Sequence, residues 1–204
     1  MPVTDEKLMR VFQSMRRNLA LSASLRSPKV LSGTLNMDDP RNMSFKGAWG
    51  FPVADRLLTN VLEQEIEFDA IVGVPTGGDF WAEKMVQMAE RVLDRTIPLY
   101  QMQKSWAGFH TREGQSLPAE SRLLVVDDTF YSGETVKAFM YALARNDFIV
   151  AGVATPVELF GQTGEDYRTC WVDGDPPVVS VYTPEFLAVN GYPKPVRSRS
   201  LKVP

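Results

Sequence analysis

Apolar residues in this chain follow two spacings that alternate from residue 51 onward. Continuous apolar runs between turn residues are typical of strands buried on both faces of a parallel sheet. Apolar residues at every third or fourth position predict amphipathic helices that cover such a sheet. The predicted strands are 68–75, 96–102, 123–126, 148–154 and 178–182, and the predicted helices are 5–21, 51–65, 80–92 and 136–143. This alternation predicts an α/β domain whose doubly wound, mostly parallel sheet is flanked by helices.

The segments outside this alternation are interpreted from their turn-forming residues. Residues 22–46 are rich in Ser, Gly, Pro, Asn and Asp, and predict irregular structure or a short strand. Residues 103–120 form a long polar stretch, and loops of this length are usually functional or disordered. Thr183 and Pro184 predict the N-cap and first residue of a short helix. We therefore predict a single domain with an N-terminal helix and irregular segment (1–50), an α/β core (51–185) and an extended tail (186–204), the two terminal segments forming a small hood.

The composition is that of a soluble globular protein, with 44% apolar and 23% charged residues. Its formal charge of −3 gives no basic footprint for nucleic acid, and no apolar run is long enough to span a membrane. The single cysteine, Cys170, excludes an intramolecular disulfide and a zinc site built on several cysteines. We expect a cytoplasmic protein that binds neither membrane nor nucleic acid.

Two adjacent acids follow the predicted strand 123–126. Asp127 and Asp128 stand at its carboxyl end, where open α/β sheets place their ligands. The residues between these acids and the next helix supply hydroxyls and a flexible backbone: Thr129, Ser132, Gly133 and Thr135. A helix start has unpaired N–H groups and a partial positive charge, so it can bind a phosphate. Each of these residues is also an ordinary capping or turn residue, so a purely structural turn stays open.

A second turn of similar kind follows the predicted strand 68–75. It reads Thr76-Gly77-Gly78-Asp79 and leads into the helix predicted near Phe80. Backbone N–H groups of such a turn can meet phosphate oxygens, and Asp79 can cap the helix. The alternative is a tight strand-to-helix turn that needs glycine for its backbone conformation.

The first of these turns is similar to the 5-phosphoribosyl-1-pyrophosphate (PRPP) signature of type I phosphoribosyltransferases, which has four apolar residues, two acids and T-x-x-S-G-x-T. The resemblance implies that Asp127 and Asp128 bind the ribose hydroxyls. It implies that the 5-phosphate is bound by the residues that follow: Thr129, Phe130, Tyr131, Ser132, Gly133, Glu134 and Thr135. The second turn is similar to the pyrophosphate loop of that family, which implies that Thr76, Gly77 and Gly78 bind pyrophosphate. Mg²⁺ is expected to bind through PRPP, with Asp127 or Asp128 as the candidate direct ligands.

The resemblance also implies that the polar stretch 103–120 is a mobile hood that closes over the reacting sugar. Orotate-type members carry Lys and His there in an R-K-x-x-K-x-H-G pattern, and this chain has Q-K-S-W-A-G-F-H-T-R-E-G. The candidate catalytic residues are Lys104, His110 and Arg112, together with Asp128. His110 is the sole histidine, and a lone histidine in a loop is more often solvated than catalytic.

The implied function is phosphoribosyl transfer, a pentosyl transfer, from PRPP to a nucleobase, which yields a nucleoside monophosphate and pyrophosphate. The last strand and its extension, V-V-S-V-Y-T-P-E-F-L, resemble the orotate branch, whereas residues 131–135 would suit purine or pyrimidine-regulatory members of the family equally well. The alternative is a PRPP-sensing regulator that keeps the pocket and has little or no activity, supported by the basic N-terminal segment and tail. We expect PRPP and a nucleobase as ligands and a homodimer as the assembly.

Overall fold

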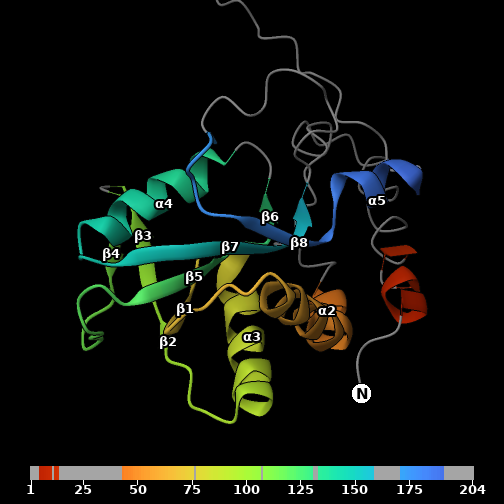
Figure 1. Ribbon diagram of the computed structural model, residues 1–204, viewed down its shortest axis with the longest axis horizontal. Helices are drawn as coiled ribbons and strands as arrows, with labels where there is room; N and C mark the ends of the chain where they lie inside the picture. The colour runs from red at the N-terminus through yellow and green to blue at the C-terminus, as the bar shows by residue number, and fades with distance from the viewer. Residues whose placement is uncertain are drawn as a thin grey trace, which may run out of the picture.

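The computed structural model describes residues 5–10, 12–13, 43–75, 77–106, 108–130, 133–158 and 171–190. Its centre is a sheet in the order β2-β1-β5-β7, in which β6 and β8 also pair with β7 (Figure 1). The strands are β1 (Ala70–Gly73), β2 (Leu99–Tyr100), β5 (Arg122–Val126), β6 (Thr129–Phe130), β7 (Ile149–Glu158) and β8 (Val178–Tyr182). All of these pairings are parallel. The predicted α/β fold with a mostly parallel sheet is confirmed.

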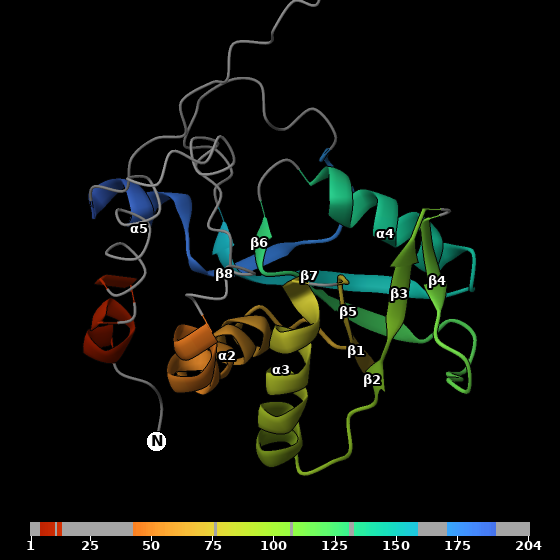
Figure 2. The same ribbon diagram turned by 180° about the vertical axis from the view of Figure 1, so that it is seen from behind.

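Helices cover both faces of this sheet. Helices α2 (Met43–Glu63) and α3 (Gly77–Leu93) lie on one face and α4 (Glu134–Ala144) on the other, as Figure 2 shows from behind. Because successive side chains of a strand point to opposite faces, β5 contributes to both cores. Leu124 and Val126 pack in the cluster with α2 and α3, whereas Leu123 and Val125 pack in the cluster with α4. The unbroken apolar run of β5 follows from burial on both sides.

The N-terminal residues pack against the last strand and its helix, α5 (Pro184–Val189). The Phe12 ring lies 5.7 Å from that of Tyr182 and 5.2 Å from that of Phe186. The Tyr182 hydroxyl donates to the Leu8 carbonyl at 3.0 Å, and burial raises the pKa of this phenol. The predicted cap of α5 is confirmed, because the Phe186 N–H donates to Thr183 Oγ1 at 3.2 Å.

Three predicted boundaries differ from the structure. Helix α2 begins at Met43, so it crosses the predicted boundary at residue 50 and includes the last residues of the predicted irregular segment. The helix was predicted to begin at residue 51 from the spacing of its apolar residues, and Pro52 lies inside the observed helix. The buried side chains of Val53 and Leu57 provide apolar burial that offsets the missing proline N–H. Residues 186–189 are helical rather than extended.

The predicted long loop contains a hairpin. Strands β3 (Met102–Ser105) and β4 (Gly108–Thr111) pair antiparallel and form a separate two-stranded sheet. The Phe109 ring packs edge-on against Phe139 of α4 at 5.0 Å, and the Tyr100 hydroxyl hydrogen-bonds with Thr111 Oγ1 at 2.7 Å. Because only these few side chains of the hairpin are packed, its sequence alternates weakly between apolar and polar residues, and this weak pattern did not indicate strands.

The remaining expectations about the terminal hood fall on residues 14–42, 159–170 and 191–204, which lie outside the described residues. Within the described part, none of the helices combines the length and the apolar character that a membrane crossing requires.

Candidate functional site

The two predicted turns meet at one edge of the sheet. Strands β1 and β5 are parallel neighbours, with Gly73 opposite Val126, so the turns that follow them lie side by side. The Val74 N–H donates to the Val126 carbonyl at 2.8 Å. A Cβ on Gly78 would lie 2.1 Å from that same carbonyl oxygen, and a Cβ on Gly77 would lie 2.5 Å from Asp128 Oδ2. Glycine is therefore required because the start of α3 lies directly against the end of β5.

The glycine turn itself differs from the predicted open loop. Helix α3 begins at Gly77, three residues before the predicted start, so both glycines belong to its first turn. The Gly78 N–H donates to the Val74 carbonyl at 2.8 Å, so the prediction that it is offered to a ligand is wrong for this conformation. Gly77 lies at the first position, where helix N–H groups lack intrahelical partners. Thr76 lies outside the described residues.

The two acids have different surroundings. Asp127 is buried, with 8% of its surface exposed, and its N–H donates to the Ala154 carbonyl at 3.1 Å. Its Oδ1 accepts the N–H of Asp128 at 2.9 Å, so this carboxylate also holds the turn. Asp128 is half-buried, and its carboxylate faces Gly77 at the start of α3. Asp128 is therefore the acid that joins the two turns.

The predicted phosphate loop is only partly a loop. Thr129 and Phe130 form β6, which pairs with β7. The Phe130 side chain is 1% exposed, packs edge-on against Trp171 at 5.1 Å and lies in the core shared with α4. Its ring is therefore not available to a ligand, and the predicted role of Phe130 in phosphate binding stays a prediction for its backbone. Tyr131 and Ser132 lie outside the described residues.

Helix α4 begins directly after this segment. Its N-cap is Gly133, whose φ of 76° is a left-handed conformation that favours glycine. Glu134 and Thr135 occupy the first turn and are exposed. The predicted anion site would use the N–H groups of this turn, since a helix start at the carboxyl edge of a sheet is a common place for an anion to bind.

The hairpin separates the residues that we predicted to be catalytic. Lys104 lies opposite Phe109 and Gln103 lies opposite His110, so Lys104 and His110 point to opposite faces of the hairpin. The Lys104 ammonium lies 5.5 Å from the centroid of the Phe109 ring, on the face that packs against α4. The structure thus does not bring Lys104 and His110 together.

Arg112 follows the hairpin and is held by Gln101. Its N–H donates to the Gln101 carbonyl at 3.2 Å and its Nη1 donates to Gln101 Oε1 at 2.8 Å. Burial raises the pKa of Asp79 in the first turn of α3, and the charge of Arg112 acts in the opposite direction. Glu83 raises that pKa further. The guanidinium of Arg112 therefore acts electrostatically on the start of α3.

The comparison with known proteins agrees with this geometry. The model of the family described as phosphoribosyl transferase domain matches residues 51–191, which is more than half of the chain. The chain belongs to this family. The match covers β1, the glycine turn, the hairpin, the acids and the start of α4.

The known proteins that are similar to this chain carry names that refer to different functions. The bifunctional protein PyrR of Syntrophobacter fumaroxidans is 28% identical over 102 residues, which are 44% of this chain and 55% of the relative. The chain thus matches about half the length of that relative. The orotate phosphoribosyltransferase of Aeropyrum pernix has a TM-score of 0.54 at 23% identity, covering 76% of this chain and 83% of that one. An adenine phosphoribosyltransferase of Leishmania donovani has a TM-score of 0.50 at 15% identity, covering 74% and 69%. These structures share the fold and do not select a base.

The structure adds site residues that the sequence did not indicate. Glu158 ends β7 at the same edge as the acids, and Ser180 Oγ donates to its Oε2 at 3.0 Å. Lys137 of α4 donates to Asp175 at 2.7 Å, an ion pair with both side chains largely buried. Glu158 could have been found from the rule that ligands gather at the carboxyl ends of strands. The predicted strand ended at residue 154, whereas β7 runs through Glu158.

The family implies Mg²⁺ together with PRPP. Among the described residues, no three His, Cys, Asp or Glu side chains are grouped so that they could hold a metal ion. Two acids near a phosphate site nevertheless suit Mg²⁺, which is usually bound by one or two carboxylates and by substrate phosphates. Asp127 and Asp128 are the residues that fit this pattern.

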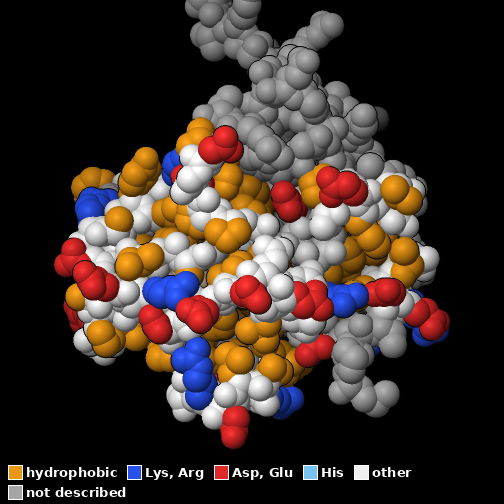
Figure 3. Space-filling model, in the orientation of Figure 1, with side chains coloured by type: hydrophobic (Ala, Val, Ile, Leu, Met, Phe, Trp, Pro, Cys, Tyr) orange, Lys and Arg blue, Asp and Glu red, His pale blue; other side chains and the backbone are white. Residues whose placement is uncertain are grey.

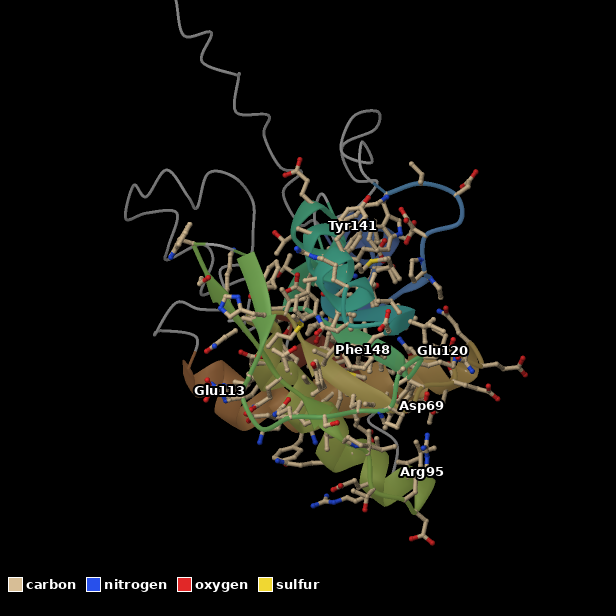
Figure 4. The ribbon with its side chains drawn as sticks, turned by 90° about the vertical axis from the view of Figure 1, so that its left-hand side faces the viewer. Asp69, Arg95, Glu113, Glu120, Tyr141 and Phe148 are labelled. Carbon is tan, nitrogen blue, oxygen red and sulfur yellow. The ribbon has the colours of Figure 1, made fainter. Side chains whose placement is uncertain are left out.

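The surface away from this site shows mixed charges and a second groove. On the face shown in Figure 3, Lys and Arg side chains are interspersed with Asp and Glu rather than gathered in one basic patch. A groove of about 670 Å³ lies at the opposite edge of the sheet, where the strands begin. Asp69 and Arg95 line it and are labelled in Figure 4. Arg95 donates to the Phe68 carbonyl at 2.8 Å, so its guanidinium is engaged in holding this end of the sheet.

Proposed function

We propose that this protein transfers the phosphoribosyl group of PRPP to a nucleobase. The observation that carries the proposal is the contact between the start of α3 and the Asp128 carboxylate, where a Cβ on Gly77 would lie 2.5 Å from Oδ2. A ligand with a sugar between two phosphate groups needs an acid flanked by two anion sites. The starts of α3 and α4 are such sites, because helix N-termini bind anions.

The proposed reaction breaks the bond between C1 of the ribose and pyrophosphate, and forms a bond between C1 and a ring nitrogen of the base. Asp128 accepts hydrogen bonds from the ribose hydroxyls, assisted by Asp127. Arg112 and the N-terminus of α3 stabilise the charge that develops on the leaving pyrophosphate. Mg²⁺ bound with PRPP would supply further charge neutralisation. A proton on the attacking nitrogen leaves to solvent or to a nearby carboxylate.

Arg112 is central to this proposal because the glycine turn contains no Lys or Arg. Asp79 adds a carboxylate to the same helix start, and Arg112 offsets its charge. Lys104 and His110 are proposed as secondary candidates only, since they lie on opposite faces of the hairpin. A closing movement of the hairpin would have to bring one of them to the sugar.

A second candidate function is PRPP sensing without transfer. The observation that favours it is Asp79, because a carboxylate beside the pyrophosphate site disfavours the further negative charge that pyrophosphate gains as it leaves, which sensing does not require. Similarity to the protein named bifunctional protein PyrR is compatible with either function. The orotate preference rests on the resemblance of the last strand and its extension alone.

The two functions are separated by one experiment. The protein is incubated with PRPP, Mg²⁺ and orotate, uracil, adenine or guanine in turn, and pyrophosphate release is measured. Release with one base supports the transferase. PRPP binding without release with any base supports the sensor, and absence of PRPP binding contradicts both.

A matched pair of variants tests the ribose assignment. Asp128→Asn keeps the size of the side chain and removes its charge, so we expect PRPP affinity to fall by about tenfold or more, as for a hydrogen bond to a charged group. Asp94→Asn changes an exposed acid beyond the far end of α3 and serves as the control. Equal PRPP affinity of Asp128→Asn and the unchanged protein would contradict the assignment.

A further inference from the structure

The groove of about 670 Å³ at the edge where the strands begin has one acidic wall. This wall is the segment between α2 and β1, in which exposed Glu65, Glu67 and Asp69 alternate with buried Ile66 and Phe68. Such alternation is expected of an extended chain, whose successive side chains point to opposite sides. Because the buried side chains fix the segment, the three carboxylates are held in a row at the surface.

The opposite wall of the groove is the end of α3, and it carries a cation. Leu93 and Arg95 line this wall. Arg95 donates to the Phe68 carbonyl at 2.8 Å, so its guanidinium is held at the rim. Arg122 at the start of β5 is the second cation of the described lining, and its Nη1 pairs with Glu67 at 2.7 Å. The charge available on this wall is therefore that of Arg95.

The two walls are complementary in charge to each other, and Asp69 and Arg95 mark them in Figure 4. Asp69 accepts the Arg122 N–H at 2.7 Å. Glu65 and Arg95, on opposite walls, have no ionic partner within the part of the chain that the structure describes. In a dimer with two-fold symmetry, every contact between two different residues occurs twice. A two-fold axis through the groove can thus place Arg95 of each copy against Glu65 of the other.

Apolar side chains lie between and beside these walls. Leu62 and Leu93 line the groove. Val92, next to Leu93 in the chain, is 57% exposed, and Ile149, which pairs in register with Arg122, is 51% exposed. Exposed apolar surface with a polar rim is typical of protein interfaces. A second copy seated on the groove would cover this surface while its charges meet the opposite charges of the rim.

We propose that this groove is an interface with a second copy of the chain, related by a two-fold axis that pairs Arg95 of each copy with Glu65 of the other. The interface lies where the strands begin, whereas the candidate site lies at the carboxyl edge of the sheet. Each PRPP site is then formed by one copy alone and faces away from the axis. The inference does not depend on the proposed transfer, and separation of the copies should leave PRPP binding unchanged.

A charge swap tests the pairing. Sedimentation equilibrium of the whole protein gives the dimer Kd at low and at high salt, and circular dichroism checks that each variant is folded. Arg95→Glu and Glu65→Arg are measured alone and as an equimolar mixture. Arg145→Glu, an exposed residue after α4, is the matched control. In the mixture both contacts across the axis again join opposite charges, whereas each variant alone brings like charges together.

A second pair of variants leaves all of these hydrogen bonds intact. It is needed because Arg95→Glu also removes the hydrogen bond to the Phe68 carbonyl. Val92→Asp places a charge in the apolar part of the proposed interface, and Val189→Asp on α5 is its control because Val189 is also exposed.

We expect the unchanged protein to dimerise, and Arg95→Glu and Glu65→Arg each to raise the dimer Kd by about tenfold or more, since two attractive contacts become repulsive. The effect should shrink at high salt, and the mixture should associate as tightly as the unchanged protein. Val92→Asp should also raise the Kd, and neither control should change it. A monomer at every concentration, or charge variants and Val92→Asp that dimerise like their controls, would overturn the proposal. A fall in PRPP affinity on dissociation would contradict the placement of the interface away from the site.

Discussion

Alanine substitution at the two glycines that begin α3 should have opposite effects, since one variant loses stability and the other loses PRPP binding. In Gly78→Ala the new Cβ would lie 2.1 Å from the Val126 carbonyl oxygen, a backbone atom that accepts the Val74 N–H at 2.8 Å. Overpacking of this kind costs about 3 kcal/mol, and loss of the hydrogen bond costs about 1 kcal/mol. Alanine regains about 1 kcal/mol of helix propensity, so the free energy of unfolding should fall by about 3 kcal/mol.

In Gly77→Ala the new Cβ meets a side chain instead. The Asp128 carboxylate lies 2.5 Å from the Cβ position, and it can rotate away. That rotation costs about 1 kcal/mol, which the gain in helix propensity offsets. Gly77→Ala should therefore fold with nearly unchanged stability and bind PRPP weakly, because the displaced carboxylate no longer meets the ribose.

Thermal unfolding followed by circular dichroism and PRPP titration calorimetry check both outcomes. A loss of 3 kcal/mol corresponds to a Tm lower by roughly 6–12 °C for a chain of this size. Gly152→Ala is the control, because its Cβ would lie 3.2 Å from the ends of the Ile66 side chain, which can shift. The reasoning is refuted if Gly78→Ala melts with the unchanged protein, or if Gly77→Ala retains full PRPP affinity.

Three further predictions follow from single contacts. Arg112→Gln should lower PRPP affinity by about tenfold relative to an Arg91→Gln control, measured by calorimetry at fixed ionic strength, and an equal affinity of the two variants would contradict its role. Hydrogen bonds from Lys137 and Val172 lower the pKa of Asp175 below 3.8, so its contribution to stability is present above that pH and is lost as the pH falls through the lower pKa of the folded protein. In urea unfolding, Asp175→Asn should therefore have a lower free energy of unfolding than the unchanged protein at pH 7, and this difference should shrink toward pH 3. A difference that does not depend on pH would argue against the ion pair. Asp147 has a φ of 58°, so Asp147→Gly should raise the free energy of unfolding by about 0.5–1 kcal/mol, and a lower Tm would show that its side chain stabilises the turn.

Much of the fold could be predicted because burial leaves a local pattern. The run from Leu123 to Val126 is apolar at every position because both faces of β5 are covered. The hairpin was missed because its strands are short and its anchors, such as Phe109 and Thr111, contact residues on α4 and β2. Helix α2 begins earlier than predicted, because the helical spacing of apolar residues starts only at Val53 whereas the helix itself starts at Met43.

The candidate site was predicted in its parts and not in its arrangement. Asp127, Asp128 and the glycine turn were identified because strand ends and helix starts leave a sequence signature. The burial of the Phe130 ring could not be predicted, because its position in the motif says nothing about which way the ring points. The same limit applied to Lys104 and His110, which the pairing register places on opposite faces.

Local sequence was enough to locate the strands of the central sheet, the core of each helix that covers it, and the points where acids and glycines follow strands. These features depend on residues within a few positions of one another, so periodicity and turn chemistry express them. The contact of Gly77 with Asp128, the effect of Arg112 on Asp79, and the meeting of Glu158 and Trp171 at one cavity came to light only in the folded chain. Those contacts link residues far apart in the chain, and their physical origin is the parallel stacking of strand ends at one edge of the sheet.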